Sequence, residues 1–261
     1  MFKRLAIAAA ARLRAWWWIA ALASTVLLST VLAAGAATDA EDATVLLIER
    51  AYAQQSVGAP VSFTQPARVV MLPDDWSSSW PRFQGIVLYS VGFDRPPVAD
   101  RQALLALYIE RACSTLDVYL NGQRVFSGGR LAEPVTRNCQ YPQLISLPSA
   151  LLRDSGNRLD LQVRGQALER VASSRRAGGL SALKIGPQAA LESEYEARLF
   201  WNVTSVQIAS VALTVMGAIL VGLGWMHRRE AHLGYLGLLS LSWVVLSMRV
   251  WWQNGPWDTG V

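Results

Sequence analysis

Apolar and polar residues alternate from Leu116 to Leu120, where every second residue is apolar. This period of two is typical of a strand with one buried face. Asn121-Gly122 follows, the pair best suited to the two positive φ angles of a type I′ turn, and an apolar strand resumes at Val125-Phe126. The pattern therefore predicts a β-hairpin at this point of the chain.

Similar short stretches recur on both sides of the hairpin, separated by glycine, proline, asparagine and aspartate. They predict strands at Val45–Glu49, Arg68–Leu72, Ile86–Phe93, Ala103–Ile109, Leu116–Leu120, Arg124–Phe126, Leu144–Leu147, Leu159–Val163 and Ala182–Ile185. Many short strands with such turns predict a β-sandwich over residues 38–200, and about 160 residues suffice for one buried core. We expect little helix in it beyond a turn near Ser149–Arg153.

Residues 1–37 combine a basic start with an apolar run and the small residues Ala34-Gly35-Ala36. This is the layout of a secretory signal peptide with its cleavage site. The run of roughly 20 residues would also span a bilayer, so a retained N-terminal membrane anchor is the alternative. In both cases the basic residues keep the start of the chain in the cytoplasm and send the β-domain outside.

Two more apolar runs follow the β-domain. Residues 203–225 carry no charge and would reach roughly 34 Å as a helix, which predicts a transmembrane helix over 201–226. The turn 227–232 contains Arg228 and Arg229 and is therefore expected in the cytoplasm. Residues 233–252 predict a second transmembrane helix, after which residues 253–261 would lie outside again.

Small residues recur at every fourth position of the first of these helices, at Ser210, Thr214, Ala218 and Gly222. Such a ridge lets another membrane helix approach closely, so we expect it to be a packing surface. The alternative is that small residues are simply common in membrane helices.

Composition supports a membrane protein. Only 16% of the 261 residues are charged and 52% are hydrophobic, which is far from the average of soluble domains. The net charge of +5 includes basic residues flanking the apolar runs, and no basic stripe interleaved with aromatic residues suggests nucleic-acid binding. Cys113 and Cys139 both lie in the β-domain, where an extracytoplasmic location favours a disulfide; two free buried thiols are the alternative.

The β-domain contains no histidine, since both histidines lie in the turn 227–232. This excludes a Ser-His-Asp or Cys-His hydrolase and a histidine-based zinc site there. A glycosidase would need two carboxylates across a sugar cleft, but the candidate carboxylates here lie in turn-like or strand-edge sequence, where an acid is ordinarily just solvated. We therefore expect no catalytic site, metal or cofactor, and no enzyme in these residues.

What remains is a set of aromatic, basic and amide residues near the predicted loops. Aromatic faces with a few hydrogen-bonding groups suit a small polar ligand such as a sugar. The candidates are Trp76, Trp80, Arg82, Tyr89, Arg137, Asn138 and Tyr141. The alternative is that Trp76, Trp80 and Tyr89 pack in the core.

The hairpin residues Val118–Gly122, followed by Gly156–Val163, resemble the galactose-binding-like jelly roll over about Leu72–Gly186. That module occurs beside β-galactosidases and as an extracytoplasmic sensor in bacteria. The motifs are structural, so the resemblance implies a mainly β jelly-roll sandwich more strongly than it implies a ligand.

An exported jelly roll followed by membrane helices resembles bacterial seven-transmembrane receptors with diverse intracellular signalling modules. The resemblance implies the sensory part of a histidine kinase or diguanylate cyclase receptor in the bacterial inner membrane, with residues 38–200 in the periplasm. Membrane lipid, a small ligand from the carbohydrate class and a second copy in a homodimer are the expected partners. Only two helices follow the β-domain and no effector is present, so we expect a truncated fragment. A membrane-tethered carbohydrate-binding or carbohydrate-processing envelope protein, or a purely structural one, is the alternative.

Overall fold

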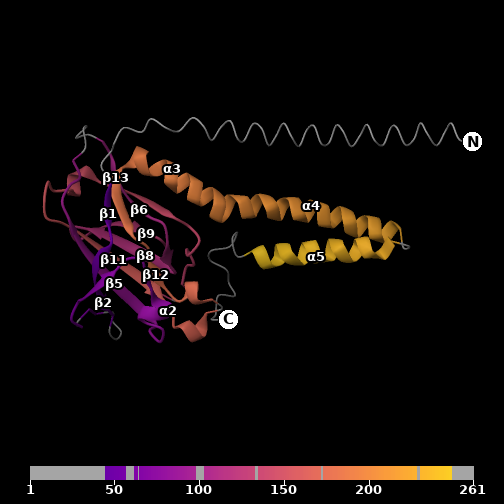
Figure 1. Cartoon of the computed structure of the whole chain (residues 1–261), viewed down its shortest axis with the longest axis horizontal. Coiled ribbons are helices and arrows are strands. Elements are labelled where there is room, and N and C mark those ends of the chain that lie inside the picture. The colour runs from indigo at the N-terminus through magenta and orange to yellow at the C-terminus, as the bar shows by residue number, and fades with distance from the viewer. Residues whose placement is uncertain are drawn as a thin grey trace, which may run out of the picture. The chain divides into compact units, whose positions relative to one another are not determined.

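The protein is described here from a computed structural model, which covers residues 45–56, 62–63, 65–97, 103–132, 135–171, 173–227 and 230–248. Short strands occupy the chain up to Pro187, and long helices follow it (Figure 1). The predicted signal segment 1–37 and the end 253–261 lie outside the described residues. The structure is therefore a β-sandwich with a C-terminal helical part.

The strands form three sheets in which the neighbouring strands are antiparallel. The four-stranded sheet has the order β1 (Leu46–Ile48), β13 (Leu183–Pro187), β6 (Leu105–Ile109), β10 (Gln143–Leu147). The six-stranded sheet has the order β3 (Arg68–Met71), β2 (Arg50–Gln55), β5 (Gly85–Phe93), β11 (Asn157–Gly165), β8 (Thr115–Leu120), β9 (Gln123–Ser127). The small third sheet has the order β4 (Asp74–Asp75), β12 (Gly179–Leu180), β7 (Ala112–Cys113).

Short helical turns complete the β-domain. They are α2 (Trp76–Ser79), η1 (Ser149–Leu151), η2 (Leu168–Arg170) and η3 (Ser174–Arg176). All nine predicted strands are present, with ends shifted by a few residues, and η1 falls in the predicted turn. Strands β2, β4, β7 and β12 were not predicted; three of these are two residues long and carry no periodic pattern.

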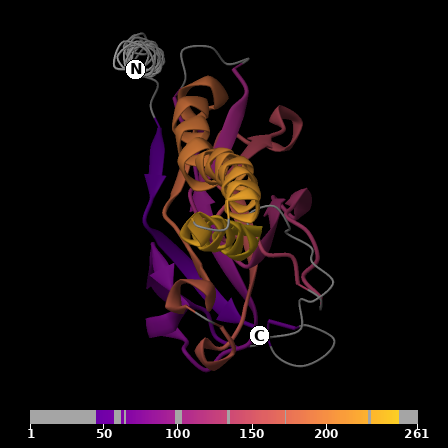
Figure 2. The same cartoon turned by 90° about the vertical axis from the view of Figure 1, so that its right-hand side faces the viewer.

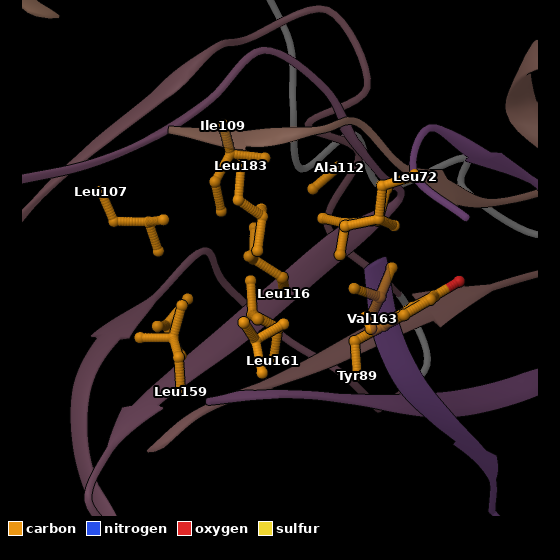
Figure 3. Packing of buried hydrophobic residues seen from close by; sticks show 14 of the residues in the cluster. Leu72, Tyr89, Leu107, Ile109, Ala112, Leu116, Leu159, Leu161, Val163 and Leu183 are labelled. Atoms are coloured by element: carbon orange, nitrogen blue, oxygen red, sulfur yellow. The ribbon is translucent and has the colours of Figure 1, made fainter. Parts of the chain in front are cut away.

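The main core lies between the two larger sheets, because each strand turns its alternate apolar residues toward the opposite sheet (Figure 3). Leu159, Leu161 and Val163 of β11 face inward and are fully buried. Leu107 and Leu183 reach the same core from the four-stranded sheet. Burying a side chain of this size contributes about 1.5–3 kcal/mol, so this alternation drives the pairing of the sheets.

The predicted hairpin is present as β8 and β9, and its turn has the expected backbone. Asn121 has φ 50° and Gly122 has φ 87°, both in the left-handed region that the type I′ turn requires. The Asn121 amide also donates to Leu151 O (2.7 Å) and to Asn157 Oδ1 (3.1 Å). The two halves of the sequence motif thus bond to each other and stabilise the fold.

Helix α3 (Gln188–Leu199) packs on the outer face of the four-stranded sheet. Its Leu191 is 1% exposed and contacts Ala106 and Tyr108 of β6. Lys184 Nζ bonds Glu194 (2.7 Å). This helix was not predicted from the sequence, because its polar residues resemble the end of a soluble domain. The helical part therefore begins earlier than residue 201.

From α3 the helix continues without a break through the π-helical turn η4 (Phe200–Thr204) into α4 (Ser205–Met226). Helix α5 (Ala231–Ser247) returns beside α4, as Figures 1 and 2 both show. Residues 228–229 and all residues after 248 lie outside the described part of the chain. Among the described residues one helix, Gln188–Met226, is long and apolar enough to cross a membrane.

The predicted ridge does not make the contact between α4 and α5. A Cβ added at Gly222 would meet nothing within 4 Å, and Thr214 and Ala218 are exposed. Only Ser210 is buried, and its hydroxyl donates to Val206 O (2.7 Å) within its own helix. Three of the four ridge residues, Thr214, Ala218 and Gly222, are therefore exposed beside the seam.

The seam is formed by glycines that were not singled out from the sequence. A Cβ at Gly217 would lie 3.1 Å from Gly237 O, and one at Gly224 would lie 2.5 Å from Gly234 N. Glycine at these four positions lets the two backbones touch, the arrangement expected of membrane helices.

Candidate ligand-binding face

The two outer faces of the sandwich differ. The four-stranded sheet is covered by α3, whereas several outward residues in the middle of the six-stranded sheet are exposed or half-buried. The strand register places four of these outward residues in one row across the sheet. Tyr52 pairs with Ser90, Ser90 pairs with Asp160, and Asp160 pairs with Tyr119. We call Tyr52, Ser90, Tyr119, Arg158 and Asp160 the open face.

The centre of the open face is a hydrogen-bonded polar cluster. Ser90 Oγ donates to Asp160 Oδ1 (2.5 Å), and Arg158 Nε donates to the same oxygen (2.9 Å). Arg158 Nη2 also donates to Ser90 Oγ (3.3 Å). These bonds fix the carboxylate in one orientation, while the Arg158 side chain is 62% exposed and reaches solvent.

A tyrosine lies on each side of this cluster. Tyr52 on β2 is 58% exposed, and Tyr119 on β8 is half-buried. Strands β5 and β11 separate them, and three interstrand steps of about 4.8 Å make a row of roughly 14 Å. Aromatic faces at both ends and a fixed carboxylate–guanidinium pair between them suit an extended ligand with apolar faces and hydroxyl groups.

The tryptophans proposed from the sequence as ligand contacts are core residues. Trp76 is 0% exposed and its Nε1 donates to Tyr89 OH (2.7 Å), which donates to Asp74 Oδ2 (2.6 Å). Burial, and then the charge of Asp74, raise the pKa of Tyr89 above its ordinary value. Trp80 is 6% exposed and packs against Trp76 and Tyr89. The alternative given above, core packing of all three, is therefore correct.

The remaining loop candidates do not form one site. Arg82 and Arg137 are exposed, and Tyr141 is half-buried. Asn138 is 5% exposed, and its side chain donates to Gly128 O (2.5 Å), so it stabilises its own loop and does not face a ligand. Neighbouring Cys139 is joined to Cys113 in a disulfide, with Cα atoms 4.3 Å apart.

The sequence pattern is sufficient to identify most residues of the open face. Tyr119, Asp160 and Ser90 occupy the polar positions of strands that were predicted, so alternation alone assigns them outward. Tyr52 was missed because β2 was not predicted. Which sheet would be covered by a helix cannot be read from alternation.

No protein-family model matches the chain, and a search of curated proteins gave no match. Solved structures resemble its sandwich at TM-scores near 0.4. A GH2 β-galacturonidase from Eisenbergiella tayi is 13% identical, with TM-score 0.39 over 56% of this chain and 24% of that one. A β-glucuronidase from Faecalibacterium prausnitzii is 16% identical, with TM-score 0.40 over 57% and 32%. A β-D-mannosidase from Dictyoglomus thermophilum is 11% identical, with TM-score 0.37 over 55% and 22%.

The chain thus spans between 22% and 32% of the length of these enzymes. They correct one expectation: the prediction that these residues contain no enzyme is contradicted, because the solved structures named here are glycosidases. Their activities are properties of those proteins. The matches named here are not receptors, kinases or cyclases, so the receptor resemblance stays a prediction, and the sandwich resembles domains of GH2 glycosidases.

Proposed function

We propose that the chain is a membrane-tethered extracytoplasmic module whose open face binds a carbohydrate. The observation that carries the proposal is the row of Tyr52, Ser90, Asp160 and Tyr119 on the uncovered sheet. A β-sandwich with one sheet free and one sheet held by an anchoring helix is suited to presenting that row to a ligand.

The open face offers a sugar both kinds of contact it needs. The C–H faces of a pyranose ring stack on tyrosine rings, and its hydroxyls bond to charged planar groups. Both bonds to Asp160 use Oδ1, so Oδ2 is the oxygen that accepts a ligand hydroxyl. Arg158 donates to a ring or hydroxyl oxygen on the same side. A row of roughly 14 Å fits an oligosaccharide better than a monosaccharide.

The helix Gln188–Met226 supplies the tether. Its 22-residue α4 segment has no charged side chain and extends roughly 33 Å, enough to cross the hydrocarbon core. Large apolar side chains cover its exposed surface, among them Val211, Val215 and Ile219. A lipid environment explains this exposure, which water would penalise.

The test is oligosaccharide binding by the full chain in detergent, first on a glycan array and then by calorimetry. Tyr52→Ala and Asp160→Asn are each expected to weaken binding at least tenfold, equivalent to about 1.4 kcal/mol. Tyr195→Ala on α3 is the matched control and leaves affinity unchanged. Glycan binding that survives both open-face substitutions would place the site elsewhere, and absence of any glycan binding would refute the carbohydrate assignment.

A second candidate, the input part of a signalling receptor, is favoured by the unbroken helix from α3 to α4. In that case a ligand-induced movement of the sandwich would turn α4, whose exposed Ala218 and Gly222 would contact another helix. Cysteines placed at Ala218 in two copies of the chain should then crosslink differently with and without ligand. Identical crosslinking in both conditions would contradict signalling through this surface.

A further inference from the structure

Next to the first row of the open face lies a second row, in which a glycine separates two arginines. Arg158 of β11 pairs with Gly92 of β5. On the other side of Gly92, Arg50 of β2 lies two residues before Tyr52, which pairs with Ser90. We infer that the ligand of the open face is an acidic oligosaccharide whose anionic group lies over Gly92. The inference rests on the proposed carbohydrate binding and specifies the class of carbohydrate.

Both arginine side chains leave the sheet on its open side. Ala51, which lies between Arg50 and Tyr52, is 3% exposed and belongs to the core. Leu159, next to Arg158, is fully buried in the same core. Because successive residues of a strand point to opposite faces, Arg50 and Arg158 share the open face with Tyr52.

The surface over Gly92 is open. Gly92 is exposed, and apart from its chain neighbours a Cβ added there would meet one described atom within 4 Å, Asn157 O at 3.9 Å. Strand β5 alone separates β2 from β11, so the backbones of Arg50 and Arg158 lie roughly 10 Å apart, two interstrand steps. An anionic group over Gly92 is therefore within reach of both long side chains.

The two guanidinium groups are held differently. Arg158 Nε donates to Asp160 Oδ1 (2.9 Å) and Nη2 donates to Ser90 Oγ (3.3 Å). The bond to Ser90 fixes this guanidinium beside β5, the strand that contains Gly92. The Arg50 side chain is exposed and forms no hydrogen bond or ion pair within the part of the chain that the structure describes.

The second row consequently carries an excess of positive charge. Asp160 balances the charge of Arg158. Asp94 lies two residues after Gly92, and its Oδ1 accepts from Gly156 N (2.8 Å), which turns it toward the loop before β11. Arg50 has no such partner, and guanidinium groups bind oxyanions through paired N–H donors. An anionic group on the ligand supplies the missing counter-charge.

The position also fits a sugar bound on the first row. Gly92 is a diagonal neighbour of Tyr52, roughly 7–8 Å away, which is close to the span of a sugar ring with an exocyclic group. A ring that stacks on Tyr52 can thus place its carboxylate or sulfate over Gly92 and a hydroxyl at Asp160 Oδ2. An exposed ion pair contributes up to roughly fivefold in affinity.

The experiment compares acidic oligosaccharides with their own neutral forms, using the full chain in detergent. Uronic acids are neutralised by carboxyl reduction and sulfated sugars by desulfation, so that only the anionic group changes. Calorimetry at low salt should show at least fivefold tighter binding of the acidic form, and high salt should reduce this preference. The pair of forms that shows the preference distinguishes a carboxylate from a sulfate.

Two substitutions test the position of the anionic group. Arg50→Gln removes the unbalanced charge and should reduce the preference for the acidic form to less than twofold. Gly92→Val keeps both arginines but fills the space between them, and it should reduce the preference as well; the strand accepts it because a Cβ has room there. The matched control is Arg170→Gln, which removes an exposed positive charge in η2, beyond the opposite end of β11, and should keep the preference.

Equal affinity for the acidic and neutral forms would overturn the inference, while the proposed carbohydrate binding would stand. A preference that survives both Arg50→Gln and Gly92→Val would locate the anionic group elsewhere and also overturn it. An equal loss in Arg170→Gln would reveal an effect of net charge and contradict a contact at Gly92. If neither form of any oligosaccharide binds, the proposed function and this inference fail together.

Discussion

Asn157 offers a sharp test of the idea that the sequence motif is a structural one. This side chain is 1% exposed and makes three hydrogen bonds. Its Oδ1 accepts from Arg153 N (2.8 Å) and from the Asn121 amide (3.1 Å), and its Nδ2 donates to Arg153 O (2.7 Å). It therefore joins the loop before β11 to the β8–β9 hairpin.

Asn157→Ala removes all three bonds. A hydrogen bond contributes about 1 kcal/mol net, so the expected loss is about 3 kcal/mol. Arg153 is exposed, which lets water reach its backbone groups and keeps the loss at that value. For a domain of this size 1 kcal/mol corresponds to about 2–4 °C, so the melting temperature should fall by about 6–12 °C.

Asn121→Gly removes the side-chain hydrogen bonds of this residue without changing the backbone of the turn, because glycine also adopts the φ of 50° found at this position. It removes the bonds to Leu151 O and from Arg158 N, and the shared bond to Asn157. The double variant should be about 1 kcal/mol less destabilised than the sum of the single variants, since both delete the shared bond.

The assay is thermal unfolding of the full chain in detergent, followed by tryptophan fluorescence. Asn202→Ala, which deletes a surface bond to Gln140 O, is the control and should cost at most about 0.5 kcal/mol. A fall of less than about 3 °C for Asn157→Ala would refute the reasoning, and so would strict additivity of the two substitutions.

Three further outcomes are expected. Gly165→Ala would place its Cβ 2.2 Å from the buried ring of Trp76 and should destabilise the domain by about 3 kcal/mol, measured by the same thermal scan; normal stability would contradict that packing. Burial raises the pKa of Tyr108 to about 12, so the stability it contributes is complete below pH 10 and lost as the pH rises toward 12; Tyr108→Phe should flatten this decline in a pH series of unfolding curves. Gly224→Leu should separate α4 from α5, seen as reduced energy transfer between labels on the two helices, whereas Gly222→Leu, with nothing within 4 Å, should leave it unchanged.

The hairpin was predictable because its information is local. Alternation and the Asn-Gly pair decide the backbone of residues 115–127 without help from the rest of the chain. The burial of Trp76, in contrast, depends on residues that are distant in the sequence. Its indole is buried because Gly165 and Gly178 leave room for it and Tyr89 accepts its N–H. A tryptophan beside a turn has the same sequence signal whether it faces a ligand or the core.

Helix α3 was missed for a related reason, and it matters more for function. Only Leu191 among its residues is buried, too little to produce a periodic pattern. Its place on the four-stranded sheet nevertheless decides which outer face remains available. The sequence could assign Tyr119 and Asp160 to an outer face, but only the packing of α3 makes that face the open one.

The same packing limits how a ligand on the open face can influence the membrane. Both sheets, which lie about 10 Å apart, and their close-packed core separate that face from α3. The ion pairs of α3 are partly exposed and contribute little, so the buried Leu191 is its main attachment. A close-packed sandwich moves as a rigid body and does not deform internally, so we expect α3 to move together with it. The π-helical turn η4, which joins the polar helix to the apolar one, is then the place where any relative movement is taken up.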